Sequence, residues 1–231
     1  MENPEDSLLG GGYIHTNTYK EQAYKLIKDA VLYNRFRVGA VYSQEAICNE
    51  LGISRTPVRE ALLELQNEGY VSFSRGKGVK VVPVTEKDAK DILEMRLFLE
   101  KNNAYLAASR ATDEDLNQIV SCFDELNSKL SLLDSRLLYR IDHTFHRAIA
   151  LATHNDWMTR ETELILDNYL RFETKSVYNN SIDAQVVLDE HLAIRNAIID
   201  RNPDKAEQMM NSHLNKSYSR TLSQFWNAPA K

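Results

Sequence analysis

Three histidines and one aspartate in the second half of this sequence have the types and spacing of metal ligands. Asp142 and His146 are four residues apart in a segment of helical periodicity, so both lie on or beside one apolar face of the predicted helix. His191 and His213 each fall in the apolar stripe of a further predicted helix. Three helices therefore turn a ligand-type side chain toward the interior of a predicted bundle.

Three imidazoles and a carboxylate could occupy four positions around Zn²⁺, Ni²⁺ or a similar divalent cation. An ion that prefers six ligands would keep two positions for water or for the oxygens of a bound molecule. Each histidine alone is more typical of a hydrogen-bonded core residue, and only their occurrence on three helices favours a metal site. His15, His143 and His154 lie outside these stripes, and we do not expect them to be ligands.

A second group of residues is suited to contacting DNA. Ser54 is placed to cap a short helix, and Arg55, Thr56 and Arg59 point away from its apolar stripe near its N-terminus. Pro57 is tolerated in the first turn. Arginines at this position can fork onto guanine edges or phosphates, and the free N–H groups of a helix N-terminus favour a phosphate.

The segment after this helix predicts a β-hairpin, with strands at 70–74 and 79–82. Its tip is basic and rich in glycine, because Lys77 lies between Gly76 and Gly78 and could approach a phosphate or a narrow groove closely. Three short helices, the last two joined by a glycine turn, precede the hairpin. This order predicts a winged helix-turn-helix. A solvated basic helix face would explain the arginines alone, but not the turn, the cap and the hairpin together.

The elements that position these groups divide the chain into three parts. Residues 1–18 are expected to be a flexible arm, and residues 19–85 the DNA-binding domain. Residues 86–231 are expected to form an all-helical bundle. The fold class is therefore mostly α. Helices are predicted at about 86–110, 113–133, 135–153, 157–178, 184–201 and 203–226.

The charge of the chain is divided unevenly between these parts. The 231 residues carry a net charge of −5, which for the whole chain disfavours a nucleic-acid partner. Residues 19–85, however, hold ten basic and seven acidic residues, a net +3, whereas residues 86–231 hold 18 basic and 23 acidic residues. No apolar run approaches the ~20 residues of a membrane span. Two cysteines and the lack of a secretory signal predict a cytoplasmic protein.

Residues 51–62, Leu-Gly-Ile-Ser-Arg-Thr-Pro-Val-Arg-Glu-Ala-Leu, closely resemble the recognition-helix signature of the GntR family of bacterial transcription regulators. The resemblance covers about residues 19–85. It implies that a homodimer binds a palindromic operator in double-stranded DNA through this helix and the glycine-rich wing. Gln44 and Cys48 depart from the usual family residues, and Glu45 stands where several members carry a DNA-contacting arginine.

The second part resembles the FadR-type C-terminal domain called FCD, in its six-helix, VanR-like version. The four predicted metal ligands match the metal-site pattern of that domain, and residues 96–100 match its opening helix. The resemblance implies an antiparallel bundle that serves dimerisation and holds a metal and a small organic acid. Arg96 is expected to pair with the acid's carboxylate, with Arg171 as a weaker candidate. Alternatively, Arg96 is an exposed residue paired with Glu100.

Three functions use these residues. The first, which we predict, is a ligand-responsive transcriptional regulator, expected to be a repressor. The second is a regulator in which the metal itself is the signal. The third is a metal-dependent hydrolase, since an open metal position can activate water. No metalloprotease motif or phosphate-binding loop is present, so we predict no catalytic residues and no enzyme activity.

Overall fold

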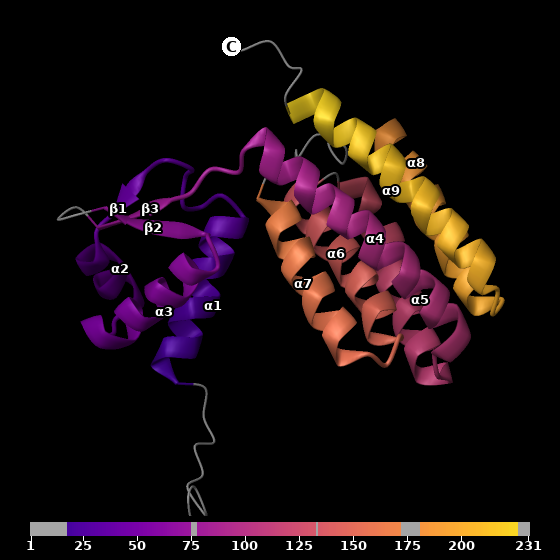
Figure 1. Cartoon of the computed structure of the whole chain (residues 1–231), viewed down its shortest axis with the longest axis horizontal. Helices are drawn as coiled ribbons and strands as arrows, with labels where there is room; N and C mark the ends of the chain where they lie inside the picture. Colours follow the sequence, from indigo (N-terminus) through magenta and orange to yellow (C-terminus); the bar gives the residue numbers. More distant parts are fainter. Residues whose placement is uncertain (1–17, 75–77, 133, 172–180, 226–231) are drawn as a thin grey trace, which may run out of the picture. The chain divides into compact units, whose positions relative to one another are not determined.

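The computed structural model describes residues 18–74, 78–132, 134–171 and 181–225. They belong to two compact units that divide between Pro83 and Val84 (Figure 1). The first unit combines short helices with a small sheet, and the described part of the second is helical. The predicted fold class is therefore confirmed.

The N-terminal unit contains three helices and three strands in its described residues. These are α1 (Tyr19–Leu32), β1 (Val41–Tyr42), α2 (Gln44–Leu51), α3 (Arg55–Asn67), β2 (Val71–Ser74) and β3 (Gly78–Val81). The side chain of Ser43 caps α2 by accepting a hydrogen bond from the N–H of Ala46 at 3.0 Å. Gly52 ends α2 with φ +65°, a left-handed conformation that favours glycine. The glycine turn between the second and third helices is therefore confirmed.

Ser54 lies at the N-cap of α3, as the sequence predicts, but its side chain makes no capping hydrogen bond. The prediction that Ser54 occupies the N-cap position is therefore confirmed, but the prediction that its side chain caps the helix is wrong. On the inner side of α3, Val58, Leu62 and Leu65 are fully buried. Because this stripe packs against α1, the N-terminal turn of α3 keeps its opposite side exposed.

The predicted hairpin is present and gains an unpredicted third strand. The antiparallel sheet has the order β1-β3-β2, with Val71 opposite Val81 and Val41 opposite Lys80. Gly78 has φ +114°, and a Cβ there would lie 2.1 Å from the carbonyl oxygen of Tyr42. Close packing of β3 on the end of β1 therefore requires glycine at this position.

The described part of the C-terminal unit contains six α-helices, in keeping with the six-helix version of the predicted bundle. They are α4 (Glu86–Arg110), α5 (Asp113–Lys129), α6 (Ser135–Leu151), α7 (Asp156–Leu170), α8 (Ser181–Ile199) and α9 (Pro203–Phe225). The α7 helix ends at Leu170 rather than at the predicted residue 178, and residues 172–180 lie outside the described part.

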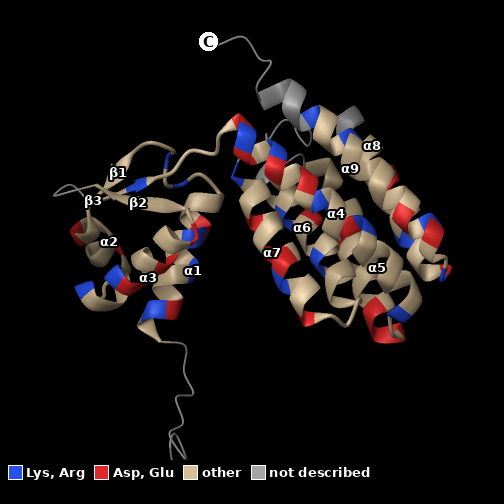
Figure 2. Ribbon diagram, viewed as in Figure 1, with Lys and Arg blue, Asp and Glu red and all other residues tan. Residues whose placement is uncertain are grey.

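The long helix α4 is the central element of this bundle, since it packs against α6, α7, α8 and α9 (Figure 1). Thr85 and Asp88 form a capping box at its start. The core between the helices includes Leu126, Phe145 and Ile194, all fully buried. Charged residues of both signs lie along the helices of this unit (Figure 2). Arg96, Glu100 and Asp142 are the charged residues of this kind that are buried in the described part of the bundle.

Candidate metal centre and DNA-reading surface

The three predicted histidine ligands meet in the interior of the C-terminal bundle. His146 on α6, His191 on α8 and His213 on α9 are at most 4% exposed. Each offers one ring nitrogen, and these three atoms lie within 4.8 Å of one another. The Nε2 atoms of His146 and His191 are 3.2 Å apart. The helices therefore bring together side chains that are 45 and 22 positions apart in the chain.

Each of these imidazoles has an oxygen atom of the protein close to its Nδ1 atom. His191 Nδ1 is 2.7 Å from the carbonyl oxygen of Val187, and His213 Nδ1 is 2.8 Å from Oε2 of Glu190. His146 Nδ1 contacts Oε2 of Glu100. An acceptor at Nδ1 fixes the proton there and leaves Nε2 with its lone pair, as in protein metal sites. With a metal bound, each ring would therefore keep its proton on Nδ1 and offer the lone pair of Nε2.

Asp142 lies on the Nε2 side of this cluster. Its Oδ1 atom is 2.8 Å from His191 Nε2, and its Oδ2 atom is 3.9 Å from His146 Nε2. The Asp142 side chain is 7% exposed. The carboxylate and the three histidines predicted from sequence thus form one buried group.

The charges of this group suit a cation. Burial, with a further contribution from the nearby His191, lowers the pKa of His213 to about 3. Burial would raise the pKa of Asp142, but the charge of His191 outweighs it and holds this pKa well below its usual range. Burial would likewise lower the pKa of His191, but the Asp142 carboxylate raises it. Without a metal, a proton between Asp142 and His191 compensates the buried charge. A divalent cation fits this donor set because it can replace that proton.

Two buried carboxylates behind the histidines were not predicted as part of the site. Glu100 contacts both His146 and Arg96, and its two neighbours outweigh the effect of burial, so that its pKa falls to about 2. Glu190 faces His213 and accepts two hydrogen bonds from Arg220, at 3.0 and 3.2 Å. The position of Glu190 next to His191 was the only sequence signal for its role.

Arg96 is 2% exposed, so the alternative of an exposed Arg96–Glu100 pair is wrong in its exposure, although the pair itself is present. Its guanidinium lies 4.2 Å from the centre of the Tyr169 ring. Arg171 lies at the end of α7, where it donates a hydrogen bond to Asn168 at 2.9 Å. The structure therefore links Arg96, through Glu100, to the histidine cluster.

The remaining histidines have other surroundings. His143 is buried, with its ring centre 6.1 Å from that of Tyr169. His154 is exposed, and its Nε2 atom lies 2.9 Å from Oδ2 of Asp115 at the start of α5. Neither belongs to the group of converging nitrogens, and His15 lies outside the described residues.

The predicted DNA-reading residues lie on the exposed side of α3. Arg55, Thr56 and Arg59 are exposed, and Pro57 is partly buried. Arg55 lies 3.7 Å from Glu45, with both side chains at least 70% exposed. Solvent screening makes this a weak pair, so the guanidinium could exchange Glu45 for another anion. The wing residues Gly76 and Lys77 lie outside the described part of the chain.

Comparison with protein families matches both units. Residues 19–81 match the model for bacterial regulatory proteins of the gntR family, and residues 91–216 match the FCD domain. The chain belongs to the GntR family. The predicted resemblance is therefore confirmed. Like its relatives, this GntR-family chain is a regulator of transcription and not an enzyme.

Relatives of this GntR-family chain include both a repressor and an activator of transcription. It is 31% identical to the HTH-type transcriptional repressor NanR of Klebsiella aerogenes, over 84% of this chain and 79% of NanR. It is 26% identical to the Glc operon transcriptional activator of Escherichia coli K12, over 84% of each chain. Among solved structures, McbR/YncC of E. coli shares the fold with a TM-score of 0.80 and 18% identity, over 90% of this chain and 99% of that one. None of the described helices is long and apolar enough to cross a membrane.

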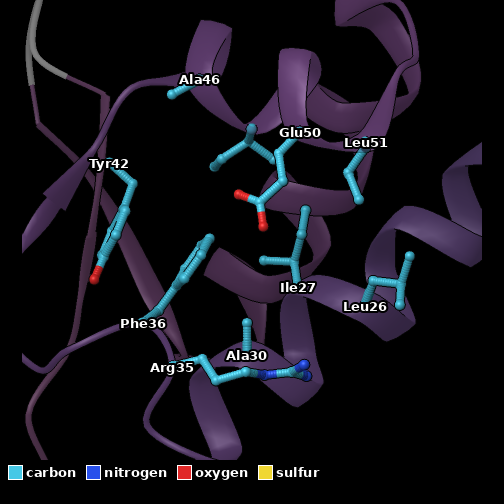
Figure 3. A pocket seen from close by; sticks show the side chains of 10 residues that line it. Leu26, Ile27, Ala30, Arg35, Phe36, Tyr42, Ala46, Glu50 and Leu51 are labelled. Carbon is cyan, nitrogen blue, oxygen red and sulfur yellow. The ribbon is translucent and has the colours of Figure 1, made fainter.

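A cavity of about 340 Å³ lies in the DNA-binding unit of this GntR-family protein (Figure 3), and none of the residues that would read DNA is among those that line it. It opens between α1 and α2, with Ile27 and Leu51 among its apolar lining. The rings of Phe36 and Tyr42 stack 4.1 Å apart on one side, and the carboxylate of Glu50 points inward (Figure 3). The cavity coincides with neither predicted site.

Proposed function

We propose that this GntR-family chain is a repressor that binds a palindromic operator as a homodimer. In this proposal, its FCD domain is of the FadR type, and a small carboxylate bound at a divalent metal releases the operator. The observation that carries the proposal is the convergence of three imidazoles whose Nδ1 atoms are each held by an acceptor. This centre lies in a chain whose other unit has an exposed basic helix N-terminus.

The DNA-reading role rests on α3 and the wing. The exposed Arg55, Thr56 and Arg59 side chains are available for base edges and phosphates. The hydroxyl of Ser54 makes no capping bond, so it and the first N–H groups of α3 could donate hydrogen bonds to a phosphate. Pro57, Gly76, Lys77 and Gly78 complete the proposed surface. Replacement of the first-turn residues should change DNA affinity without disturbing the buried stripe of α3.

The metal role rests on Asp142, His146, His191 and His213, which would hold Zn²⁺ or Ni²⁺. When bound, the metal would supply positive charge to an effector carboxylate. Arg96 is the second cation proposed to meet the effector, since a guanidinium forks onto a carboxylate and this one is buried beside the cluster. Arg171, at the end of α7, is a further candidate.

The homodimer is supported by an exposed apolar face on α4 and α7. Met95, Phe98 and Tyr105 follow one side of α4 and are 46%, 62% and 39% exposed. Trp157 and Leu164 on α7 are 70% and 39% exposed, and α7 packs beside α4. Exposed apolar side chains that recur along neighbouring helices are typical of an interface. We propose a second copy of this chain as its partner, because two copies related by a twofold axis match a palindromic operator.

A thermal-shift screen of organic acids, with and without a chelator, tests the effector site. We expect at least one small organic acid to raise the melting temperature of the metal-loaded protein, because a ligand that binds only the folded state stabilises it. The same acid should lose its effect after chelation. A shift that persists without metal would contradict metal-mediated binding. If no acid changes the melting temperature, and a DNA-binding titration shows that metal alone releases the operator, the metal is itself the signal.

A further inference from the structure

Glu100 is a buried carboxylate that joins two functional groups from different helices. It lies on α4 with 2% exposure. Its Oε1 atom contacts Nε of Arg96, and its Oε2 atom contacts Nδ1 of His146 on α6. The guanidinium proposed to meet the effector and an imidazole proposed to bind the metal therefore share one carboxylate.

Tyr169 packs against the Arg96 guanidinium and limits how far this guanidinium can move when an anion binds it. The Arg96 guanidinium lies 4.2 Å from the centre of the Tyr169 ring, and the Tyr169 hydroxyl is 3.1 Å from Oγ of Ser217. The guanidinium is thus held between an aromatic face and Glu100. A carboxylate that binds Arg96 would draw the guanidinium's charge away from Glu100. Glu100 would then interact more strongly with Nδ1 of His146, whose Nε2 faces the centre.

The second buried carboxylate, Glu190, provides an internal comparison. It holds His213 from behind, as Glu100 holds His146. Its other partners are Arg220 and Lys216, whose side chains are 23% and 58% exposed. Glu190 contacts a metal-binding imidazole but, among its described contacts, neither Arg96 nor Tyr169. Both carboxylates therefore contact a histidine of the cluster, but only Glu100 also contacts Arg96 in the described part of the chain.

We propose that Glu100 is a positioning residue that couples the occupancy of Arg96 to the metal affinity of the His146 site. This inference rests on the proposed function, since it requires a metal at the histidines and a carboxylate at Arg96. Coupling of this kind is reciprocal, so the metal would also strengthen effector binding. Outer-shell carboxylates raise the basicity of the histidines that they hold, and their loss commonly weakens metal binding about 10- to 100-fold.

A double-mutant cycle on Zn²⁺ affinity tests the coupling without an effector. The full-length wild type, Glu100→Gln, Arg96→Gln and the double variant are titrated with Zn²⁺ against a chromophoric chelator. We expect Glu100→Gln to weaken Zn²⁺ binding about 10- to 100-fold. Arg96→Gln should tighten it about fivefold, because Glu100 then interacts with His146 alone. In the Glu100→Gln background, Arg96→Gln should change Zn²⁺ affinity less than twofold.

Glu190→Gln is the matched control. We expect it to weaken Zn²⁺ binding by a similar factor, since His213 loses its acceptor, but to leave the effect of Arg96→Gln unchanged. This difference separates coupling from a general loss of order around the metal. Because Arg96 is buried, each variant is first checked by circular dichroism and thermal melting in the presence of chelator. If Arg96→Gln does not fold, Arg96→Lys replaces it in the cycle.

Three results would overturn the inference. The first is an unchanged Zn²⁺ affinity in Glu100→Gln. The second is an effect of Arg96→Gln that is equal with and without Glu100, and the third is the same non-additivity with Glu190. Failure of the wild type to bind Zn²⁺ would overturn the proposed metal centre as well. Additive effects in a protein that binds Zn²⁺ would contradict the coupling alone and leave the proposed function standing.

Discussion

The two units of this protein use arginine in opposite ways. Arg59, on α3, is exposed, and Arg96, on α4, is 2% exposed and lies between a carboxylate and an aromatic ring. Water solvates an exposed arginine, so it needs no partner within the protein and remains available to bind an anion. A buried arginine must have its charge compensated within the fold. Arg59 therefore lies outside the packing of its unit, whereas Arg96 is part of the packing of the C-terminal bundle.

This difference has a consequence for substitutions. Replacing an exposed residue proposed to read DNA should change operator affinity without changing the stability of the fold. Removing one member of the buried cluster leaves its partners with uncompensated charge or unmet hydrogen bonds. Substitutions in each unit can therefore show whether the two units are separable in this way.

The largest effect is expected for Arg59→Ala. Loss of a forked contact to a base edge costs about 1–3 kcal/mol, and a dimer would lose two, so specific operator affinity should fall about 10³-fold. Metal content and melting temperature should stay unchanged, because Arg59 lies on the exposed side of α3. The measurement is a mobility-shift titration with a DNA site selected by the wild type, at physiological salt. Retained operator affinity would show that α3 does not read DNA.

His191→Ala should have the next largest effect, on metal content. His191 contacts Asp142 and faces His146, so its loss removes a proposed ligand at the centre of the group. We expect Zn²⁺ affinity to fall at least ~100-fold, the upper limit for loss of an outer-shell partner. Operator binding without effector should persist, while the response to the acid is lost. Unchanged metal stoichiometry by elemental analysis would contradict the proposed site.

The smallest effect of the three is expected for Phe98→Asp on the exposed face of α4. A charge at a 62% exposed position should not disturb folding of the unit. If α4 and α7 form the dimer interface and Phe98 lies at its centre, the dimer dissociation constant should rise about 30-fold, which corresponds to the ~2 kcal/mol loss of a hot-spot residue. Analytical ultracentrifugation measures this directly, with Leu132→Asp, at a 59% exposed position outside α4 and α7, as the control. An equal effect of both changes would place the interface elsewhere.

The sequence was most informative where function depends on local pattern. The signature around α3 and the spacing of Asp142 and His146 each lie within one element, so periodicity alone predicts which side they occupy. The convergence of His191 and His213 with them was predicted from stripes on three helices, and it depends on tertiary packing that sequence only suggests.

What the sequence did not predict are the contacts between helices. The alternative interpretation of Arg96 placed its pair with Glu100 on the surface, because a spacing of four residues says nothing about burial. The role of Glu190 depends on α9 packing beside α8. The third strand, β1, has only two residues and no pattern of its own, and it pairs because Gly78 permits close approach. Such features arise from packing and not from local propensity.

The central claim is that the buried centre controls the exposed reading surface. The most direct test is the operator affinity of the full-length protein in four states, with and without Zn²⁺ and with and without an acid identified by thermal shift. We predict that the acid weakens operator binding at least about 10-fold when Zn²⁺ is present, a coupling of ordinary size for an allosteric regulator, and has no effect after chelation. Operator affinity that is the same in all four states would contradict the account.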